Sequence, residues 1–268
     1  MARGYRFGVV GSLSIVPDGS TVLPTDDIQI WLKCASIKGK TYTTLSQVLA
    51  DSTTLQTLIT SPNAVDYMVR STTWASGVTA DSGAMTLIGA NNYASNTLLG
   101  NSTWLNAICN STYFESVLNV KVPTMTSATA PSGEVISSAV DSGLRNYYAF
   151  NGNLTTDGQR WSSTPQGGYI GYHFTSSVRV HLIEVKNRTS GSNIRAFKNF
   201  ELQGSNDGTN WTKIAEFENT VSTASETWKV NTINSTNYEY YRLYITSAFD
   251  STSWTNAQEI QFYGRVDV

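Results

Sequence analysis

Short apolar clusters recur about every ten residues through the first half of this 268-residue chain. Each has side chains at positions i, i+3 and i+4 that are apolar, apart from Ser95 in one cluster, and this spacing places them on one face of a helix. The clusters are Leu45-Val48-Leu49, Leu55-Leu58-Ile59, Val65-Met68-Val69, Ala84-Leu87-Ile88, Ser95-Leu98-Leu99, Leu105-Ile108-Cys109 and Phe114-Val117-Leu118, with a weaker unit at Trp74-Val78. A two-turn helix is unstable alone in water, so the repeat predicts an array of short helices stabilised by packing on one another.

Residues that favour helix N-caps precede most clusters, and their side-chain oxygens can accept hydrogen bonds from first-turn N–H groups. They are Ser52, Ser61, Ser71, Asp81, Asn91 or Asn92, Ser102 and Ser111. An earlier segment, Asp26–Leu32, fits the same pattern. We therefore expect a helical module over residues 26–122, preceded by a hairpin or extended arm over residues 1–25.

The aromatic residues of this module allow two interpretations. In the first, they belong to its hydrophobic core. In the second, the module drives assembly, and exposed aromatics also pack against other subunits; the candidates are Trp74, Tyr93, Trp104 and Tyr113.

The second half has the alternation of apolar and polar residues that is typical of β-strands. Val178-Val180-Leu182 and Tyr241-Leu243-Ile245 are examples, and polar turn residues separate such runs. In 197–211, two alternating stretches flank Gly-Ser-Asn-Asp-Gly, which predicts a strand, a turn and a second strand. The pattern predicts an all-β sandwich over residues 139–268. Residues 123–138, rich in Ser, Thr, Ala and Pro, are expected to form a linker.

Composition excludes several classes of function. Only 14% of residues are charged, the formal net charge is −2, and no basic patch is present, so we expect no nucleic-acid partner. No apolar run is long enough for membrane insertion, and the first residues do not form a secretory signal. Cys34 and Cys109 are expected to be buried and reduced, with a disulfide between them as the alternative.

Catalytic motifs are not found in the sequence. Its two histidines, His173 and His181, lie within expected strands and are interpreted as structural. No nucleophile, metal-protease or phosphate-loop motif accompanies them. We therefore expect no catalytic residues and a protein that is not an enzyme.

Six segments of the second half resemble the discoidin, or F5/8 type C, family and its carbohydrate-binding-module relatives. They are residues 148–153 followed by Trp161, 168–174, 183–188, 197–211, 240–246 and 257–264. The resemblance implies a jelly-roll-like antiparallel β-sandwich. The expected fold class is thus a multidomain α plus all-β chain, with the helical array first.

The resemblance also implies a sugar site in the loops at one end of the sandwich. In carbohydrate-binding relatives an Arg, and an Asn five residues later, bond the sugar hydroxyls; Arg188 and Asn193 have that spacing. An aromatic from the loop before the last strand stacks on the sugar ring, and here it is Trp254 or, less favoured, Phe249. The alternative is that Arg188 pairs with an acid and Trp254 fills the loop. The family's galactose-binding His after Trp161 is missing, which leaves the specificity open.

A structural calcium ion is the one cofactor that the resemblance implies. The matching positions are Asn151, Asn153, Thr156 and Glu259. Because Asn151 replaces the family's Asp, Glu259 is the one certain carboxylate, joined by Asp157 if the loop brings it round. The alternative is that these groups only cap the loop by hydrogen bonds.

Residues 26–125 resemble structural proteins of tailed phages and prophages. That resemblance implies a virion protein, a capsid decoration, head fibre or tail component, made in the bacterial host cytoplasm. Its expected partners are other virion proteins, copies of itself, and bacterial or mucosal glycans. The alternatives are a purely structural virion protein without a ligand and a lectin with no phage origin.

Overall fold

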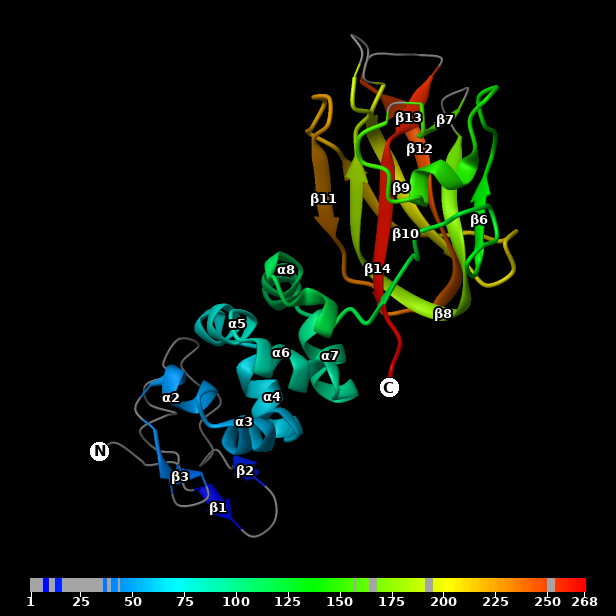
Figure 1. The fold of residues 1–268 in the computed structure, drawn as a ribbon. Helices are drawn as coiled ribbons and strands as arrows, with labels where there is room; N and C mark the ends of the chain where they lie inside the picture. Colours follow the sequence, from blue (N-terminus) through cyan, green and yellow to red (C-terminus); the bar gives the residue numbers. More distant parts are fainter. Residues whose placement is uncertain are drawn as a thin grey trace. The chain divides into compact units, whose positions relative to one another are not determined.

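The computed structural model contains two compact units, one of residues 1–119 with 267–268 and one of residues 120–266. The residues that it describes are 7–9, 13–15, 36–37, 40–42, 44–156, 158–163, 168–190, 195–249 and 254–268. The first unit is mainly helical and the second is a β-sandwich (Figure 1). The predicted fold class is confirmed. Within the described ranges, no helix has the length and apolar character needed to cross a bilayer.

Seven short helices make up most of the described part of the first unit. They are α2 (Leu45–Leu49), α3 (Ser52–Ile59), α4 (Pro62–Met68), α5 (Thr72–Thr79), α6 (Ser82–Gly89), α7 (Asn92–Leu99) and α8 (Ser102–Asn110), followed by the 3₁₀ turn η1 (Phe114–Ser116). Before them lie two small hairpins, β1 (Phe7–Val9) with β2 (Leu13–Ile15), and β3 (Ser36–Ile37) with β4 (Lys40–Thr41). The segment at residues 26–32, expected to be helical, and Cys34 lie outside the described residues.

Each helix of the array packs against the helix three positions further along the chain: α2 on α5, α3 on α6, α4 on α7 and α5 on α8. Three helices, or about thirty residues, therefore complete one turn of the array. The indole Nε1 of Trp104 in α8 donates to the Met68 carbonyl at the end of α4, 3.1 Å away. In α3 and in α5 to α8, the fourth, fifth, eighth and ninth residues counted from the N-cap are buried. This burial explains the period of ten that the sequence shows.

The helix N-caps confirm the expected chemistry but shift two positions. Side chains that accept the N–H three residues later are those of Thr44, Asp51, Ser71, Asp81, Asn91 and Asn101. The caps expected at Ser52 and Ser102 thus lie one residue earlier, because each Ser is already the first helical residue. Ser61 makes no side-chain cap; Pro62 follows it at the first helical position, where a missing N–H costs little.

The aromatic residues of the array divide between core and surface. Trp74 and Trp104 are fully buried, so the interpretation that they are exposed for assembly is wrong. Tyr93 and Tyr113 are 43% and 39% exposed. The two tryptophans belong to the hydrophobic core, because each is the fourth residue counted from the N-cap of its helix, a position that is also buried in α3, α6 and α7.

The sandwich has two antiparallel sheets that share its longest strand, and a separate two-stranded sheet. Its strands are β5 (Val120–Lys121), β6 (Glu134–Ser137), β7 (Trp161–Ser163), β8 (Tyr169–Lys186), β9 (Phe197–Ser205), β10 (Thr212–Glu218), β11 (Thr227–Asn231), β12 (Tyr238–Ala248), β13 (Thr255–Ala257) and β14 (Glu259–Arg265). The first half of β8 pairs with β12 and β6, and β12 continues to β9 and β10. The second half of β8 pairs with β14 and β11, and β14 with β5.

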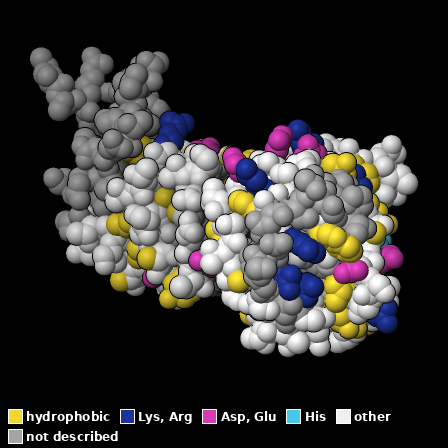
Figure 2. Space-filling model, turned by 90° about the horizontal axis from the view of Figure 1, so that it is seen from above, with side chains coloured by type: hydrophobic (Ala, Val, Ile, Leu, Met, Phe, Trp, Pro, Cys, Tyr) yellow, Lys and Arg dark blue, Asp and Glu magenta, His cyan; other side chains and the backbone are white. Residues whose placement is uncertain are grey.

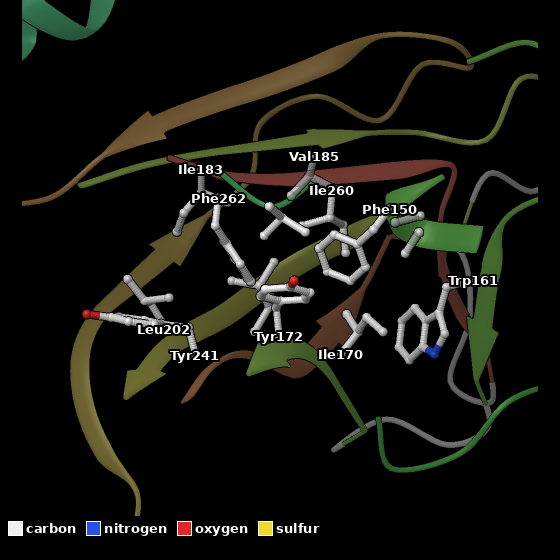
Figure 3. Close-up of a cluster of buried hydrophobic side chains, with 14 of the residues drawn as sticks. Phe150, Trp161, Ile170, Tyr172, Ile183, Val185, Leu202, Tyr241, Ile260 and Phe262 are labelled. Carbon is white, nitrogen blue, oxygen red and sulfur yellow. The ribbon is translucent and has the colours of Figure 1, made fainter. Parts of the chain in front are cut away.

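Aromatic and aliphatic side chains from both sheets fill the space between them (Figure 3). The Phe150 ring lies 6.1 Å from Tyr172 on one sheet and 6.0 Å from Phe262 on the other, measured between ring centroids. Phe150 belongs to a 3₁₀ turn, η2 (Asn146–Phe150), that enters this core. The alternation of the strands therefore produces one continuous core.

The hydroxyl of Tyr241 is bonded inside this core. It donates to the Val178 carbonyl at 2.6 Å and accepts from the Val180 N–H at 3.3 Å and from the Asn234 amide at 2.9 Å. Burial raises the pKa of Tyr241 to about 12. These bonds tie the bend between the two halves of β8 to β12.

His181 follows that bend and is also buried. Its Nδ1 lies 3.2 Å from the Thr232 carbonyl oxygen. Burial, with Arg179 and Arg265 nearby, lowers the pKa of His181 to about 4. The neutral imidazole is thus part of the folded structure.

Residues 123–138, expected to be a linker, belong instead to the sandwich. Val122 donates to the Phe262 carbonyl at 3.2 Å, and Met125 and Val135 are buried in the core. Residues 134–137 form β6, which pairs with β8. The Ser- and Thr-rich composition hid this because only a few apolar side chains anchor the segment. The sandwich accordingly begins near Val120, not at residue 139.

The segment 197–211 forms β9 and the turn into β10, as predicted. The Asp207 carboxylate accepts from the Thr209 and Asn210 N–H groups at 2.8 and 2.7 Å. The Asn210 side-chain amide, which donates to Asp207 Oδ2 at 2.6 Å, and these main-chain bonds hold the pKa of Asp207 well below its usual range. Gly208 adopts φ 70°, the left-handed region that glycine tolerates. The turn shapes the hairpin.

Candidate functional site

Four strand ends meet at the end of the sandwich that is uppermost in Figure 1. The Phe249 N–H donates to the Ala196 carbonyl at 3.1 Å, which joins the end of β12 to the start of β9. Thr255 in β13 pairs with Ser163 in β7. The same end, seen from above in Figure 2, displays basic and hydrophobic side chains together.

Arg195 is held at this end by its main chain. Its backbone is in the left-handed region, φ 54°, which an arginine rarely adopts. Its carbonyl accepts two hydrogen bonds from β13, one from the Asn256 N–H at 3.0 Å and one from the Thr255 hydroxyl at 3.3 Å. Both donors belong to the two residues that follow Trp254, so these hydrogen bonds bring the Arg195 side chain beside that indole.

The guanidinium carbon of Arg195 lies 5.8 Å from the centroid of the Trp254 ring. That distance is within the range of a cation–π contact. The Arg195 Nε and the Asn256 side-chain oxygen are both buried and lack a hydrogen-bond partner. Buried polar atoms are normally paired, so these two atoms are exceptions in the folded chain.

The residues predicted for the sugar site are only partly brought together. Phe249 and Trp254 flank the same loop, beside Ala196 and Arg195. Arg188 follows β8, and its carbonyl accepts from the Ser225 N–H at 2.9 Å, in the turn before β11. Asn193 lies outside the described residues.

Sequence reasoning did not find Arg195. The five-residue spacing of Arg188 and Asn193 drew attention away from it. A usable signal was its position two residues before an apolar strand, at a loop end facing the Trp254 loop.

The residues predicted for calcium lie together around the loop at 151–159, except Asp157, which lies outside the described residues. The Glu259 carboxylate accepts from the Gly152 N–H, with both oxygens at 3.1 and 3.2 Å. The Asn151 side-chain oxygen accepts from the Asn153 N–H at 2.8 Å, and that of Asn153 accepts from the Thr156 N–H at 2.9 Å. Burial raises the pKa of Glu259 to about 8.

Gln258 takes a position in this loop that the sequence did not reveal. Its side chain is fully buried, and its Nε2 lies close to three main-chain carbonyl oxygens. The distances are 2.8 Å to Asn153, 3.1 Å to Thr156 and 2.9 Å to Gln159.

This arrangement does not fit calcium. Ca²⁺ takes six to eight oxygen ligands, several of them charged. Here an amide nitrogen already occupies the three carbonyls, and the Asn151 and Asn153 oxygens accept main-chain N–H groups. Over the described part of the chain, no three His, Cys, Asp or Glu side chains gather as a metal site would require.

The family of the sandwich follows from comparison with known proteins. The family model of the F5/8 type C domain matches residues 132–260. This part of the chain is therefore an F5/8 type C domain. Among curated protein sequences, none is significantly similar to the chain.

Solved structures similar to the chain include three carbohydrate-binding modules. The family 32 module of C. perfringens NanJ in complex with galactose is 17% identical, with 54% of this chain and 99% of that chain covered and a TM-score of 0.42. The family 32 module of AlyQ in complex with 4,5-unsaturated mannuronic acid is 21% identical, with 48% and 92% covered and a TM-score of 0.41. A Streptococcus pneumoniae fucose binding module is 17% identical, with 52% and 94% covered and a TM-score of 0.41.

Proposed function

We propose that the sandwich binds a carbohydrate at the end formed by Arg195 and Trp254. The observation that carries the proposal is the guanidinium of Arg195 over the Trp254 ring, held there by main-chain bonds to β13. The sandwich's membership in the F5/8 type C family and its resemblance to carbohydrate-binding modules give further support.

The chemistry of this pair suits a sugar. An indole face covers the apolar C–H face of a pyranose, and a planar guanidinium offers several donors in fixed directions to hydroxyl or carboxylate oxygens. Binding of this kind needs no catalytic group.

A glycan array probed with the full chain tests the proposal. Arg195→Ala and Trp254→Ala should each weaken binding at least about tenfold, which corresponds to about 1.4 kcal/mol. The matched control is another arginine over a tryptophan in the same sandwich, Arg242, whose guanidinium carbon lies 3.9 Å from the Trp211 ring. Arg242→Ala should bind as the wild type does.

Two outcomes would contradict the carbohydrate assignment. One is the absence of binding to any glycan by the wild-type protein, which would favour a purely structural role. The other is binding by Arg195→Ala and Trp254→Ala that is as strong as that of the wild type, which would place the site elsewhere on the sandwich. Arg188→Ala, measured beside them, tests whether that arginine belongs to the same site.

For the setting of this function we propose a phage virion, made in the host cytoplasm, in which the helical array anchors the protein and the sandwich displays the glycan site. The resemblance of residues 26–125 to tailed-phage structural proteins supports the proposal. Mass spectrometry of purified particles tests it; absence of the protein from particles would favour a lectin with no phage origin. Light scattering during size exclusion should give the mass of an oligomer, and a monomer would contradict self-assembly.

A further inference from the structure

Three main-chain carbonyl oxygens of one loop converge on a single side-chain nitrogen. They belong to Asn153, Thr156 and Gln159, and the nitrogen is the Nε2 of Gln258, 2.8 to 3.1 Å away. A primary amide has two protons, so one of the three carbonyls must share a proton or remain weakly bonded. Carbonyl oxygens gathered in this way present the negative ends of three dipoles to one point, as they do around a bound cation.

The surroundings of this point are built from amides. Gln258 is fully buried, and its main-chain N–H is fixed by the Lys186 carbonyl at 2.8 Å. The Gln159 side-chain oxygen accepts from the Asn151 and Asn153 side-chain amides at 3.2 and 2.8 Å. Apart from the Glu259 carboxylate, which accepts from the Gly152 N–H, these contacts of the loop are made by neutral donors and acceptors.

We propose that the carboxamide of Gln258 takes the structural place of a cation and fastens the loop at 151–159 to the start of β14 without a metal. The amide protons supply the positive ends that the three carbonyls require. The side chain has no exposed surface through which it could swing aside for an ion. This role is independent of whether the sandwich binds a glycan.

The wild-type protein gives the first test. Its thermal unfolding is followed in EDTA and in millimolar CaCl₂, and CaCl₂ is titrated into EDTA-treated protein by calorimetry. We expect a midpoint change below about 1 °C and no saturable heat, because ligand binding to the folded state would raise the midpoint. A rise of more than about 4 °C, or stoichiometric calcium binding, would overturn the proposal.

Variants give the second test. Gln258→Ala should lower the sandwich midpoint by about 5 °C, since each buried acceptor left unbonded costs stability. Gln261→Ala is the matched control: Gln261 lies in β14, which begins directly after Gln258, and its amide donates to one carbonyl, that of Val122, at 3.0 Å. Hydrogen exchange of residues 151–159 should accelerate in the Gln258 variant alone. Equal effects of the two variants would overturn the proposal.

Gln258→Glu tests whether the Gln258 amide takes the place of a cation or only forms ordinary hydrogen bonds. The new carboxylate would face three carbonyl oxygens, so we expect a larger loss of stability in EDTA than Gln258→Ala causes. Calcium should then restore part of the loss, because a divalent cation satisfies the carboxylate and the carbonyls together. If calcium fails to stabilise Gln258→Glu, the carbonyls do not form a cation-like site and the proposal is wrong. If Gln258→Glu does not fold, its recovery from refolding with and without calcium gives the same readout.

Discussion

Removal of one oxygen atom, by Tyr241→Phe, should destabilise the sandwich by several kcal/mol. The hydroxyl bonds the Val178 carbonyl, the Val180 N–H and the Asn234 amide within a core where the Tyr241 side chain is fully buried. The ring itself would stay in place, so the loss is confined to hydrogen bonds.

The size of the effect follows from the groups that are left behind. The Asn234 amide retains a second acceptor, the Val180 carbonyl at 3.3 Å, whereas the Val178 carbonyl and the Val180 N–H lose a buried partner. An unbonded buried polar group costs about 1–3 kcal/mol, so the two together cost about 3 kcal/mol. For a unit of this size that corresponds to a fall in midpoint of roughly 6–12 °C.

Calorimetry of the full chain measures this effect, with the transition of the helical unit identified by the loss of circular dichroism at 222 nm and the other transition assigned to the sandwich. The matched control is Tyr238→Phe, which removes the hydroxyl from a partly buried ring packed edge-on against Tyr241, with centroids 5.9 Å apart. It should cost less than about 1 kcal/mol. The reasoning is refuted if Tyr241→Phe costs no more than this control.

Two further substitutions test other parts of the chain. Gly89→Ala in α6 should destabilise the helical unit by about 2 kcal/mol, because the added Cβ would lie 1.8 Å from a main-chain oxygen of η1. Gly83→Ala in the same helix is the control: its added Cβ would have its nearest contact at 3.3 Å, so it should be neutral or stabilising by up to about 1 kcal/mol. Urea unfolding followed by circular dichroism at 222 nm distinguishes the two variants. His181→Leu should flatten the pH dependence of the free energy of unfolding of the sandwich. The folded-state pKa of His181, about 4, lies below the unfolded value of 6.5, so the wild type loses up to about 3 kcal/mol of stability as the pH falls from about 6.5 to 4. An unchanged slope of stability against pH in the variant would contradict this.

The helical array was predictable because its burial is periodic. Positions such as Leu58 and Ile108 recur every ten residues, and each helix depends on its neighbours for the same reason. The hairpin at 197–211 was predictable because its turn chemistry is local, fixed by Asp207 and Gly208.

The site was less predictable because its contacts join distant parts of the chain. Arg195 is placed by bonds to Thr255 and Asn256, sixty residues on, and by a backbone angle that its sequence neighbours do not signal. Gln258 acts on a loop about a hundred residues earlier. In the sequence, the carboxylate of Glu259 predicts calcium, and nothing indicates the role of the Gln258 amide beside it.

The spacing of the helical array sets a rule for how its length can change. Each ten-residue unit advances the array by one third of a turn, since α2, α3, α4 and α5 each pack on the third helix after them. Insertion or deletion of ten residues would leave each local contact possible but would rotate the end of the array by about 120°. Only steps of about thirty residues would lengthen the array and keep its last helix facing the same way. A full turn is therefore the smallest change in length that preserves the direction of the last helix.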